Sequence, residues 1–404
     1  MSTKLAPTAV ETNEIAASGD ESARKNGIAG RRLAWIASFT LLAFLLVLAL
    51  DASLRATVKI DPYRQSNRSW VWWSVKALRN GPPPDVVICG SSLVVATVDE
   101  TDATYLKHVV DQILHWRCEY LEHCLQQRTG QPVHTADLAM GGQMVSDVYS
   151  LAKVMLQGRY KPKMIVWGIA PRDFVDATFN NPNSSETVRY MTKVAGREMF
   201  DTGHSFWDRV ERSFDKAFWT YGNRDQVVFL QHRLLKAMLH SLGWKNLEEN
   251  NLPQPLRQYV TENLPEDEGI DHWGVVPYYK GLPFSDNRGE YHTRYNPFKP
   301  SIYQFQLRYF DKMLAFCRDN HIQLMLVNMP LMQANMALMP AGMYERYSQD
   351  TSRIAQKYGI TVLDLNKPGL FPDQDYRDSV HMNGLGGQKF WQILLQHWPA
   401  STAN

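Results

Sequence analysis

Short apolar runs alternate with longer amphipathic stretches from residue 85 to the end of the chain. The apolar runs, each bounded by glycine, proline or polar residues, lie at 85–89, 133–138, 164–168, 323–328 and 361–364. Apolar residues at helical spacing fill much of the sequence between them, at 103–127, 145–156, 301–320 and 343–358, and again near the end at 385–396. Buried strands that alternate with helices are typical of a parallel sheet covered on both faces. The pattern therefore predicts an α/β domain with a doubly wound parallel sheet.

The first apolar run ends abruptly in a serine-bearing turn. The run Asp85–Cys89 is followed directly by Gly90-Ser91-Ser92, and a Gly-Pro-Pro-Pro breaker stands before it at 81–84. Neither a helix nor a sheet interior continues through such a breaker, so we expect a strand that begins near Asp85 and carries a serine at its tip. In doubly wound sheets the ligand crevice forms at the carboxyl ends of the strands, where the strand order reverses. The serine is expected at that edge.

The N-terminal part of the chain has a different pattern. Residues 1–32 are polar and show no hydrophobic period, so we expect them to be disordered. Residues 33–50 contain no charge, and as a helix they would be about 27 Å long, close to the hydrocarbon thickness of a bilayer. We interpret this run as an uncleaved single-pass anchor rather than a signal peptide, because its polar lead is long and no A-x-A cleavage site follows. Basic residues lie closer on its N-terminal side, which favours a cytoplasmic N-terminus and an extracytoplasmic domain, periplasmic or extracellular.

The rest of the chain divides into a juxtamembrane segment and one α/β domain. Residues 51–84 form a linker or helix, and the tryptophan cluster within it, at 69–75, is interpreted either as an interfacial helix or as ordinary packing. The domain spans 85–404, and its strand–helix alternation is interrupted at about 174–300. Such long insertions in compact domains are usually functional, for example as lids.

Charge and cysteine content exclude several classes of function. The chain has 43 Lys and Arg against 41 Asp and Glu, with a formal net charge of +2, which gives no signal for nucleic-acid binding. Its 4 cysteines do not follow the spacing of zinc or iron–sulfur ligands. We therefore expect no nucleic-acid partner, no metal and no cofactor.

Serine, histidine and aspartate occur at two places that a doubly wound sheet could bring together. Ser92 follows the first strand, and Asp378 and His381 share one short turn just before the last helix. A serine hydroxyl needs a base within hydrogen-bond reach, and the base needs an anion to hold its tautomer. Backbone N–H groups of Ser92 and Gly142 would stabilise the oxyanion, each donor contributing about 3 kcal/mol. Ser91 is the alternative nucleophile.

These residues resemble the SGNH or GDSL hydrolases. The turn Gly90–Leu93 matches the family's Gly-Asp-Ser-Leu block and puts Ser92 in the nucleophile position. The segment Asp137–Gly142 matches the second block, whose last glycine takes an oxyanion position, and Asp378 to His381 matches the Asp-x-x-His block. The blocks occur in the family's order across most of residues 85–397. The resemblance implies a flavodoxin-like fold of SGNH type and serine-esterase chemistry.

Two positions depart from the family pattern. Ser91 replaces the aspartate that normally precedes the nucleophile, and the third block, Gly168–Asp173, lacks the asparagine that would donate its amide to the oxyanion. Arg172 could take the place of that donor or bind an anionic group of the substrate, or it could pair with a nearby acid. Asn328 is a second possible substrate-binding residue. Further candidates to line the crevice, from the insertion, are Tyr291, His292, Arg294 and Tyr295.

Both departures resemble a membrane-anchored branch of the family, which includes the D-alanyl transfer protein of teichoic-acid operons and proteins of alginate O-acetylation. The resemblance implies a membrane-anchored serine esterase or O-acyltransferase that acts on an O-acylated envelope glycan or lipid, beside a membrane-bound O-acyltransferase. Hydrolysis and transfer both remain open. The alternative is a non-catalytic SGNH-like assembly or binding protein that partners a membrane acyltransferase.

Overall fold

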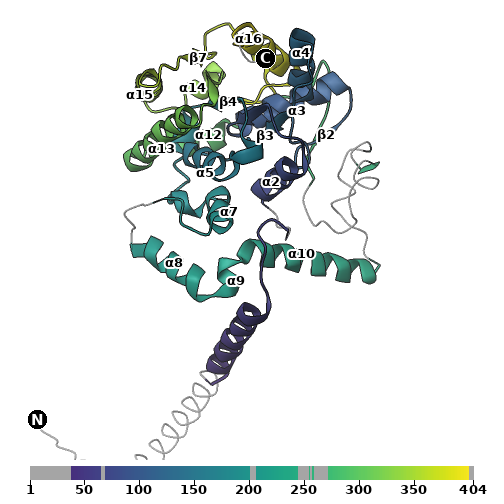
Figure 1. Cartoon of the computed structure of the whole chain (residues 1–404), viewed down its shortest axis with the longest axis vertical. Helices are drawn as coiled ribbons and strands as arrows, with labels where there is room; N and C mark the ends of the chain where they lie inside the picture. The colour runs from purple at the N-terminus through teal and green to yellow at the C-terminus, as the bar shows by residue number, and fades with distance from the viewer. Residues whose placement is uncertain are drawn as a thin grey trace, which may run out of the picture. The chain divides into compact units, whose positions relative to one another are not determined.

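The computed structural model describes residues 38–64, 69–200, 206–243, 254, 257–258 and 272–399 (Figure 1). The chain divides into two compact units. One comprises Met1–Ile60 and Arg209–Asn223, and the other comprises Asp61–Asp208 and Arg224–Asn404. The polar N-terminus predicted at 1–32 lies outside the described residues.

A five-stranded sheet forms the centre of the second unit. Its strands are β1 (Val86–Cys89), β3 (Thr135–Asp137), β4 (Met164–Ile169), β6 (Gln323–Asn328) and β7 (Val362–Asp364). All neighbours pair in parallel, in the order β3-β1-β4-β6-β7. Numbered along the chain within this sheet, the order is 2-1-3-4-5, which is the flavodoxin-like arrangement. Strands β1 and β4 are buried at every position, which explains why both appear as continuous apolar runs.

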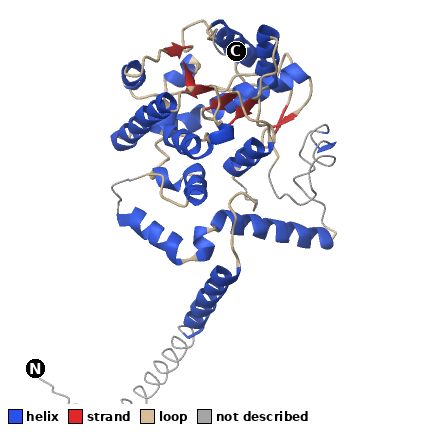
Figure 2. Cartoon of the chain, in the orientation of Figure 1, coloured by secondary structure: helices blue, strands red, loops and turns tan. Residues whose placement is uncertain are grey.

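Helices flank the sheet on both sides (Figure 2), so the prediction of a doubly wound α/β fold is confirmed. One group that packs together is α3 (Ser92–Leu106), α4 (Glu119–Thr129) and α16 (Gly384–Gln396). A second group is α5 (Val145–Met155), α13 (Pro300–Asp319) and α15 (Met343–Gln356). The single helix predicted over 103–127 is wrong. Helix α3 begins already at Ser92, and its first twelve or so residues are almost all buried, so it lacks an amphipathic period.

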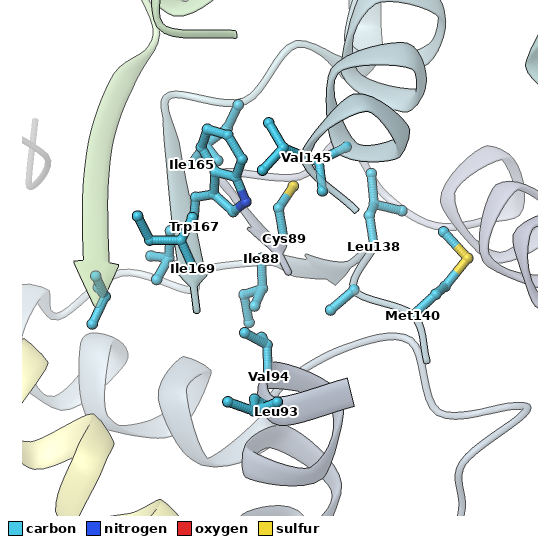
Figure 3. Close-up of a cluster of buried hydrophobic side chains, with 14 of the residues drawn as sticks. Ile88, Cys89, Leu93, Val94, Leu138, Met140, Val145, Ile165, Trp167 and Ile169 are labelled. Carbon is cyan, nitrogen blue, oxygen red and sulfur yellow. The ribbon is translucent and has the colours of Figure 1, made fainter. Parts of the chain in front are cut away.

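The core beneath the serine-bearing turn leaves no room for side chains at two glycines. Figure 3 shows buried side chains that surround this turn from several elements, among them Ile88, Cys89, Val94, Val145 and Trp167. Gly90 has a φ of +150°, and a Cβ there would lie 2.4 Å from Cγ2 of Val94. A Cβ at Gly168 would lie 2.4 Å from the same methyl carbon. The start of α3 therefore packs directly against the ends of β1 and β4, which fixes the serine that follows Gly90.

The first unit contains an apolar helix, Ser38–Thr57, that is long and apolar enough to cross a membrane. The helix has 20 residues. Its most apolar stretch has a mean hydropathy of 1.9 and is 6% buried. The helix continues past the predicted end at residue 50, and the start predicted at 33 lies outside the described residues. Near its C-terminal end, the Asp51 carboxylate accepts the backbone N–H groups of Trp219 and Thr220 at 2.9 and 2.8 Å. These bonds join the helix end to the segment around α9 (Trp219–Gly222).

Helix α2 (Trp70–Asn80) decides between the two interpretations of the tryptophan cluster. Trp72 and Trp73 are each 3% exposed and belong to the same core cluster as the residues of β1. The cluster therefore packs into the domain, and the interpretation as an exposed interfacial helix is wrong for these two rings. Trp70, at the first position of the helix, is half-buried.

The insertion predicted at about 174–300 is mainly helical where the structure describes it. Its helices, with the one that leads into it, are α6 (Arg172–Val175), α7 (Glu186–Ala195), α8 (Phe206–Ala217), α9, α10 (Arg224–Ser241) and α12 (Arg288–Tyr295). A short strand, β5 (Gly274–Val275), pairs antiparallel with β2 (Val110–Asp111). Ser285 forms an isolated parallel bridge with Asp378. The end of the insertion thus returns to the loop that carries the predicted Asp and His.

A buried ion pair lies at the side of α3. The side chain of Asp102 is 0% exposed and accepts a hydrogen bond from Nε2 of His115 at 2.7 Å. It also accepts the backbone N–H groups of Glu119 and Tyr120 at the start of α4, at 2.6 and 2.9 Å. Burial by itself would lower the pKa of His115, but the hydrogen bond and the charge of Asp102 raise this pKa to about 9.

This pair predicts a pH-dependent stability. The pKa of His115 in the folded protein lies above its ordinary value of 6.5. The pair's contribution to the free energy of unfolding is therefore fully present below about pH 6.5 and is lost as the pH rises through 9. We expect the free energy of unfolding to fall by about 3 kcal/mol over this range. Urea unfolding of the full chain in detergent, from pH 6 to 10, measures it. Asp102→Asn should remove this pH dependence, and the control His108→Ala, at an exposed position, should keep it. If the stability of Asp102→Asn depended on pH as the wild type does, the dependence would not come from the His115–Asp102 pair.

Candidate active site

Ser92 lies at the first position of the 15-residue helix α3, directly after the turn that ends β1. The preceding Ser91 is 2% exposed, and its side chain lies beside the Asp173 carboxyl group. Ser92 is half-buried and its hydroxyl bonds elsewhere, to His381. The N-terminus of a helix favours negative charge, such as the charge that develops on a serine oxygen as it loses its proton. Of the two alternative nucleophiles, the structure brings Ser92 to a base.

Ser92, His381 and Asp378 form a continuous hydrogen-bonded chain. The Ser92 Oγ lies 2.9 Å from Nε2 of His381, and Nδ1 of the same ring lies 2.6 Å from Oδ2 of Asp378. The His381 side chain is 14% exposed and that of Asp378 is 8% exposed. When Nδ1 carries the hydrogen and donates it to Asp378, Nε2 is left as the acceptor for the Ser92 hydroxyl. The chain therefore has the geometry required for general-base activation of a serine.

The Asp378 carboxylate is held in its ionised form. Its Oδ1 accepts the backbone N–H groups of Val380 and His381 at 2.9 and 2.8 Å. Burial raises the pKa of this carboxyl group, but the hydrogen bonds and charge of His381 more than offset that effect, and the net pKa lies below the ordinary 3.8. An ionised carboxylate fixes the imidazole tautomer and stabilises the imidazolium that forms when the ring takes a proton.

The insertion helps to hold the loop that carries Asp378 and His381. The Asn287 side-chain oxygen accepts two hydrogen bonds from Ser379, one from the backbone N–H at 3.1 Å and one from the hydroxyl at 2.5 Å. The Ser285 N–H donates to the carbonyl oxygen of Arg377 at 2.9 Å. Sequence reasoning missed Asn287, because this residue stands in a segment without periodicity, and a single asparagine before a helix gives no signal of its partner.

Gly142 occupies a tight turn beside the serine. The Gln143 N–H donates to the Met140 carbonyl oxygen at 3.2 Å, and Gly142 has a φ of +78°, as the third residue of a type II turn requires. The N–H of Met140 donates in turn to the carbonyl oxygen of Gly90 at 3.2 Å. This bond joins the glycine turn to the serine turn. Gly142 itself is exposed.

Arg172 braces the glycine turn from within the protein. The residue is 4% exposed, and its guanidinium donates to the carbonyl oxygens of Gly142 and Gln143 at 3.0 and 2.8 Å. It also donates to Oδ2 of Asp176 at 2.8 Å, and Arg294 donates to that same oxygen at 2.6 Å. Of the alternatives that the sequence left open for Arg172, this arrangement matches pairing with a nearby acid. The guanidinium also holds the carbonyl groups of the turn, a role that the sequence did not suggest.

Asn328, the other possible substrate-binding residue, lies at the end of β6 and is 4% exposed. Its amide nitrogen donates to the Tyr344 hydroxyl at 2.8 Å and to the Asp364 carboxylate at 2.7 Å. Its oxygen accepts a hydrogen bond from the Tyr347 hydroxyl at 2.9 Å. None of these partners belongs to the chain of Ser92, His381 and Asp378, so the structure does not bring Asn328 to the serine.

Tyr291 of α12 reaches the serine from the insertion. The residue is 3% exposed, and its phenol lies beside the Ser92 side chain. Burial raises the pKa of the phenol above its ordinary value of 10.0, so the hydroxyl keeps its hydrogen at neutral pH. A phenol that keeps its hydrogen can donate a hydrogen bond. The sequence suggested Tyr291 only as one of several lining residues.

The arrangement suits acyl transfer through a serine. It combines a nucleophile, a base with its orienting carboxylate, a helix N-terminus and a glycine turn at neighbouring strand ends. Within the part of the chain that the structure describes, no group of three or more His, Cys, Asp and Glu side chains is placed to hold a metal ion.

Comparison with known proteins does not identify a family for this chain. No family model matches the chain, and no curated protein matches it. Among solved structures, the chain is similar to a protein of Bacteroides fragilis described as a "putative acylhydrolase". The two are 11% identical, the match covers 80% of this chain and 92% of that one, and the TM-score is 0.33. At this TM-score the function of one protein does not inform that of the other.

Proposed function

We propose that this protein is a membrane-anchored serine esterase or O-acyltransferase of SGNH type, which acts on an O-acylated glycan or lipid of the cell envelope. The observation that carries the proposal is the chain from Ser92 through His381 to Asp378, with its 2.9 and 2.6 Å contacts. The apolar helix Ser38–Thr57 supports the anchor. The extracytoplasmic position of the domain follows from the distribution of basic residues around that helix.

The proposed reaction proceeds through an acyl-serine. The Ser92 Oγ attacks the ester carbonyl carbon while its proton moves to Nε2 of His381. The tetrahedral intermediate collapses, the bond to the alcohol breaks, and the His381 proton goes to the leaving oxygen. Water or a second hydroxyl then gives its proton to His381, and its oxygen attacks the carbonyl carbon of the acyl-serine. The bond to the Ser92 Oγ breaks, His381 returns the proton to Ser92, and the acyl group leaves as an acid or as a new ester.

The proposed oxyanion hole contains the backbone N–H groups of Ser92 and Gly142. The Gly142 turn is held by Arg172 through two carbonyl oxygens, so its peptide groups are fixed before the reaction. The family's third donor, an asparagine amide, is missing from Gly168–Asp173. We assign that role to the Tyr291 hydroxyl, which lies beside Ser92 and, in its protonated form, can donate a hydrogen bond to the negative charge that forms there.

Tyr291→Phe is expected to lower kcat for ester hydrolysis by about 10²-fold, with little change in KM, because one donor to the developing charge is lost. Stopped-flow release of p-nitrophenol from p-nitrophenyl acetate by the full chain in detergent measures both constants. The matched control is Tyr279→Phe, at an exposed tyrosine of the same insertion. Equal kcat for Tyr291→Phe and the wild type would remove Tyr291 from the site.

Product analysis tests the function as a whole. The full chain in detergent is supplied with p-nitrophenyl acetate, with and without an oligosaccharide acceptor, and acetate, p-nitrophenol and acylated sugar are quantified. An esterase releases acetate and p-nitrophenol in equal amounts, whereas a transferase forms acyl-oligosaccharide at the expense of acetate. Formation of neither product above the level of Ser92→Ala would contradict the proposal.

A further inference from the structure

A cleft of about 440 Å³ opens beside the glycine turn. Its lining comes from the start of α2, from the glycine turn with the start of α5, and from the segment that leads into α7. Gly141 and Gly142 are part of this lining. Its volume falls within the range of small-molecule sites, about 300–1,000 Å³. Residues with larger or polar side chains in the lining include Trp70, Gln143, Asp147, Phe179, Ser184 and Glu186.

The lining combines aromatic faces with hydrogen-bonding groups. Trp70 is half-buried, and its ring lies against Gly141, where a Cβ would be 3.4 Å from Cζ3. Phe179 supplies a second half-buried ring. Asp147, which is 3% exposed, accepts hydrogen bonds from the Ser185 hydroxyl at 2.5 Å and the Met144 N–H at 2.9 Å, and these bonds fix the orientation of its carboxylate.

Gln143 provides an independent sign that the cleft has a ligand. The residue is 3% exposed, yet neither the nitrogen nor the oxygen of its side-chain amide has a hydrogen-bond partner in the protein. A buried amide without partners costs about 1–3 kcal/mol, so a folded protein retains one where a ligand or water supplies the missing bonds. The amide offers both donors and acceptors, as a sugar hydroxyl does.

The charge of the lining narrows the class of ligand. Asp147 and Glu186 are acidic, and none of the residues that line the cleft in the described part of the chain is Lys or Arg. Carboxylate and phosphate groups are usually bound by Arg, Lys or backbone N–H groups, so an anionic polymer would meet only like charges here. An uncharged sugar ring fits both features, because its C–H face packs on aromatic rings and its hydroxyl edge bonds to amides and carboxylates.

We propose that this cleft is a carbohydrate subsite for a neutral sugar, a hexose or N-acetylhexosamine unit of a glycan, whose hydroxyl end would lie at the Gly142 turn. The inference rests on the proposed function, since it names the substrate class of the same site. It predicts that uronate and phosphate-linked polymers bind poorly.

Direct binding measurements test the subsite without relying on turnover. The full chain carrying Ser92→Ala, in a polyoxyethylene detergent that contains no sugar, is titrated by calorimetry with chitotetraose, cellotetraose and tetragalacturonate. At least one neutral tetrasaccharide should bind at least tenfold more tightly than the uronate. Trp70→Ala should weaken that binding at least tenfold, and Trp273→Ala, at an exposed tryptophan outside the cleft, should not.

Gln143→Met provides the readout that separates binding from folding. Because it replaces an amide without partners by an apolar group of similar size, we expect its melting temperature to be equal to or above that of the wild type, with at least tenfold weaker sugar binding. Unchanged affinity in both Trp70→Ala and Gln143→Met, tighter binding of the uronate, or no binding of either neutral sugar would overturn the subsite. If sugars bind as expected and no ester is cleaved, the subsite stands and the proposed catalytic function fails.

Discussion

Ser92→Ala is expected to lower ester turnover by at least about 10⁴-fold, with substrate binding largely retained. The hydroxyl is the only atom that would form the acyl bond, and the Ser92–His381–Asp378 chain places it 2.9 Å from its base. His381→Ala should cause a similar loss, and the double variant should be little worse than either single one, because the residues act as one unit. Steady-state hydrolysis of p-nitrophenyl acetate by the full chain in detergent measures these effects.

The matched control for this prediction is Ser91→Ala. Ser91 precedes the nucleophile, is buried, and lies beside Asp173, whereas His381 bonds to Ser92. Its loss should lower the free energy of unfolding by about 1 kcal/mol and leave kcat within about tenfold of the wild type. If Ser91→Ala abolished turnover while Ser92→Ala retained it, the nucleophile would be Ser91. If Ser92→Ala and His381→Ala both complemented a deletion strain fully, the non-catalytic alternative would be correct.

Arg172→Met should lower both stability and turnover. It removes the buried cation that bonds to Asp176 at 2.8 Å, so we expect a loss of about 3–5 kcal/mol in the free energy of unfolding. It also releases the carbonyl oxygens of Gly142 and Gln143, which should lower kcat by about 10²–10³-fold through a displaced oxyanion donor. Thermal unfolding and kcat of the full chain, measured on the same sample, test both effects.

Arg172→Lys is the companion variant. A single ammonium group cannot reach two carbonyl oxygens and a carboxylate in the fixed geometry of a guanidinium, so it should restore part of the stability and less of kcat. The effect should appear in kcat and not in KM, because Arg172 acts on the turn and not on the substrate. A large rise in KM with unchanged kcat would instead indicate that Arg172 binds the substrate.

Much of the fold could be predicted from the sequence because its strands are parallel and buried. Strands β1, β4 and β6 contain continuous apolar runs between turn residues, and such runs have few other interpretations. Helix α3 was harder to place. Its buried residues include Asp99, Glu100 and Asp102, so charged residues occupy positions where a core helix normally has apolar ones. Only the three-dimensional partners of these acids, such as His115, reveal that they are buried.

The candidate site could be predicted only where sequence blocks mark it. Ser92, Asp378 and His381 stand at chain positions that a doubly wound sheet brings to one edge, and the structure places them within hydrogen-bond distance. Tyr291 could be named only as one of several lining candidates, and Asn287 could not be predicted, because the insertion has no period that fixes its path back to the sheet. The partners of Arg172 likewise depend on a turn about thirty residues earlier in the chain.

A covalent probe tests the central claim most directly. The full chain in detergent is treated with a fluorophosphonate, which reacts with activated serines, and the labelled peptides are identified by mass spectrometry. The account predicts one adduct, on Ser92, that is absent from Ser92→Ala and strongly reduced in His381→Ala. Equal labelling of the wild type and Ser92→Ala, or an adduct confined to another serine, would contradict it.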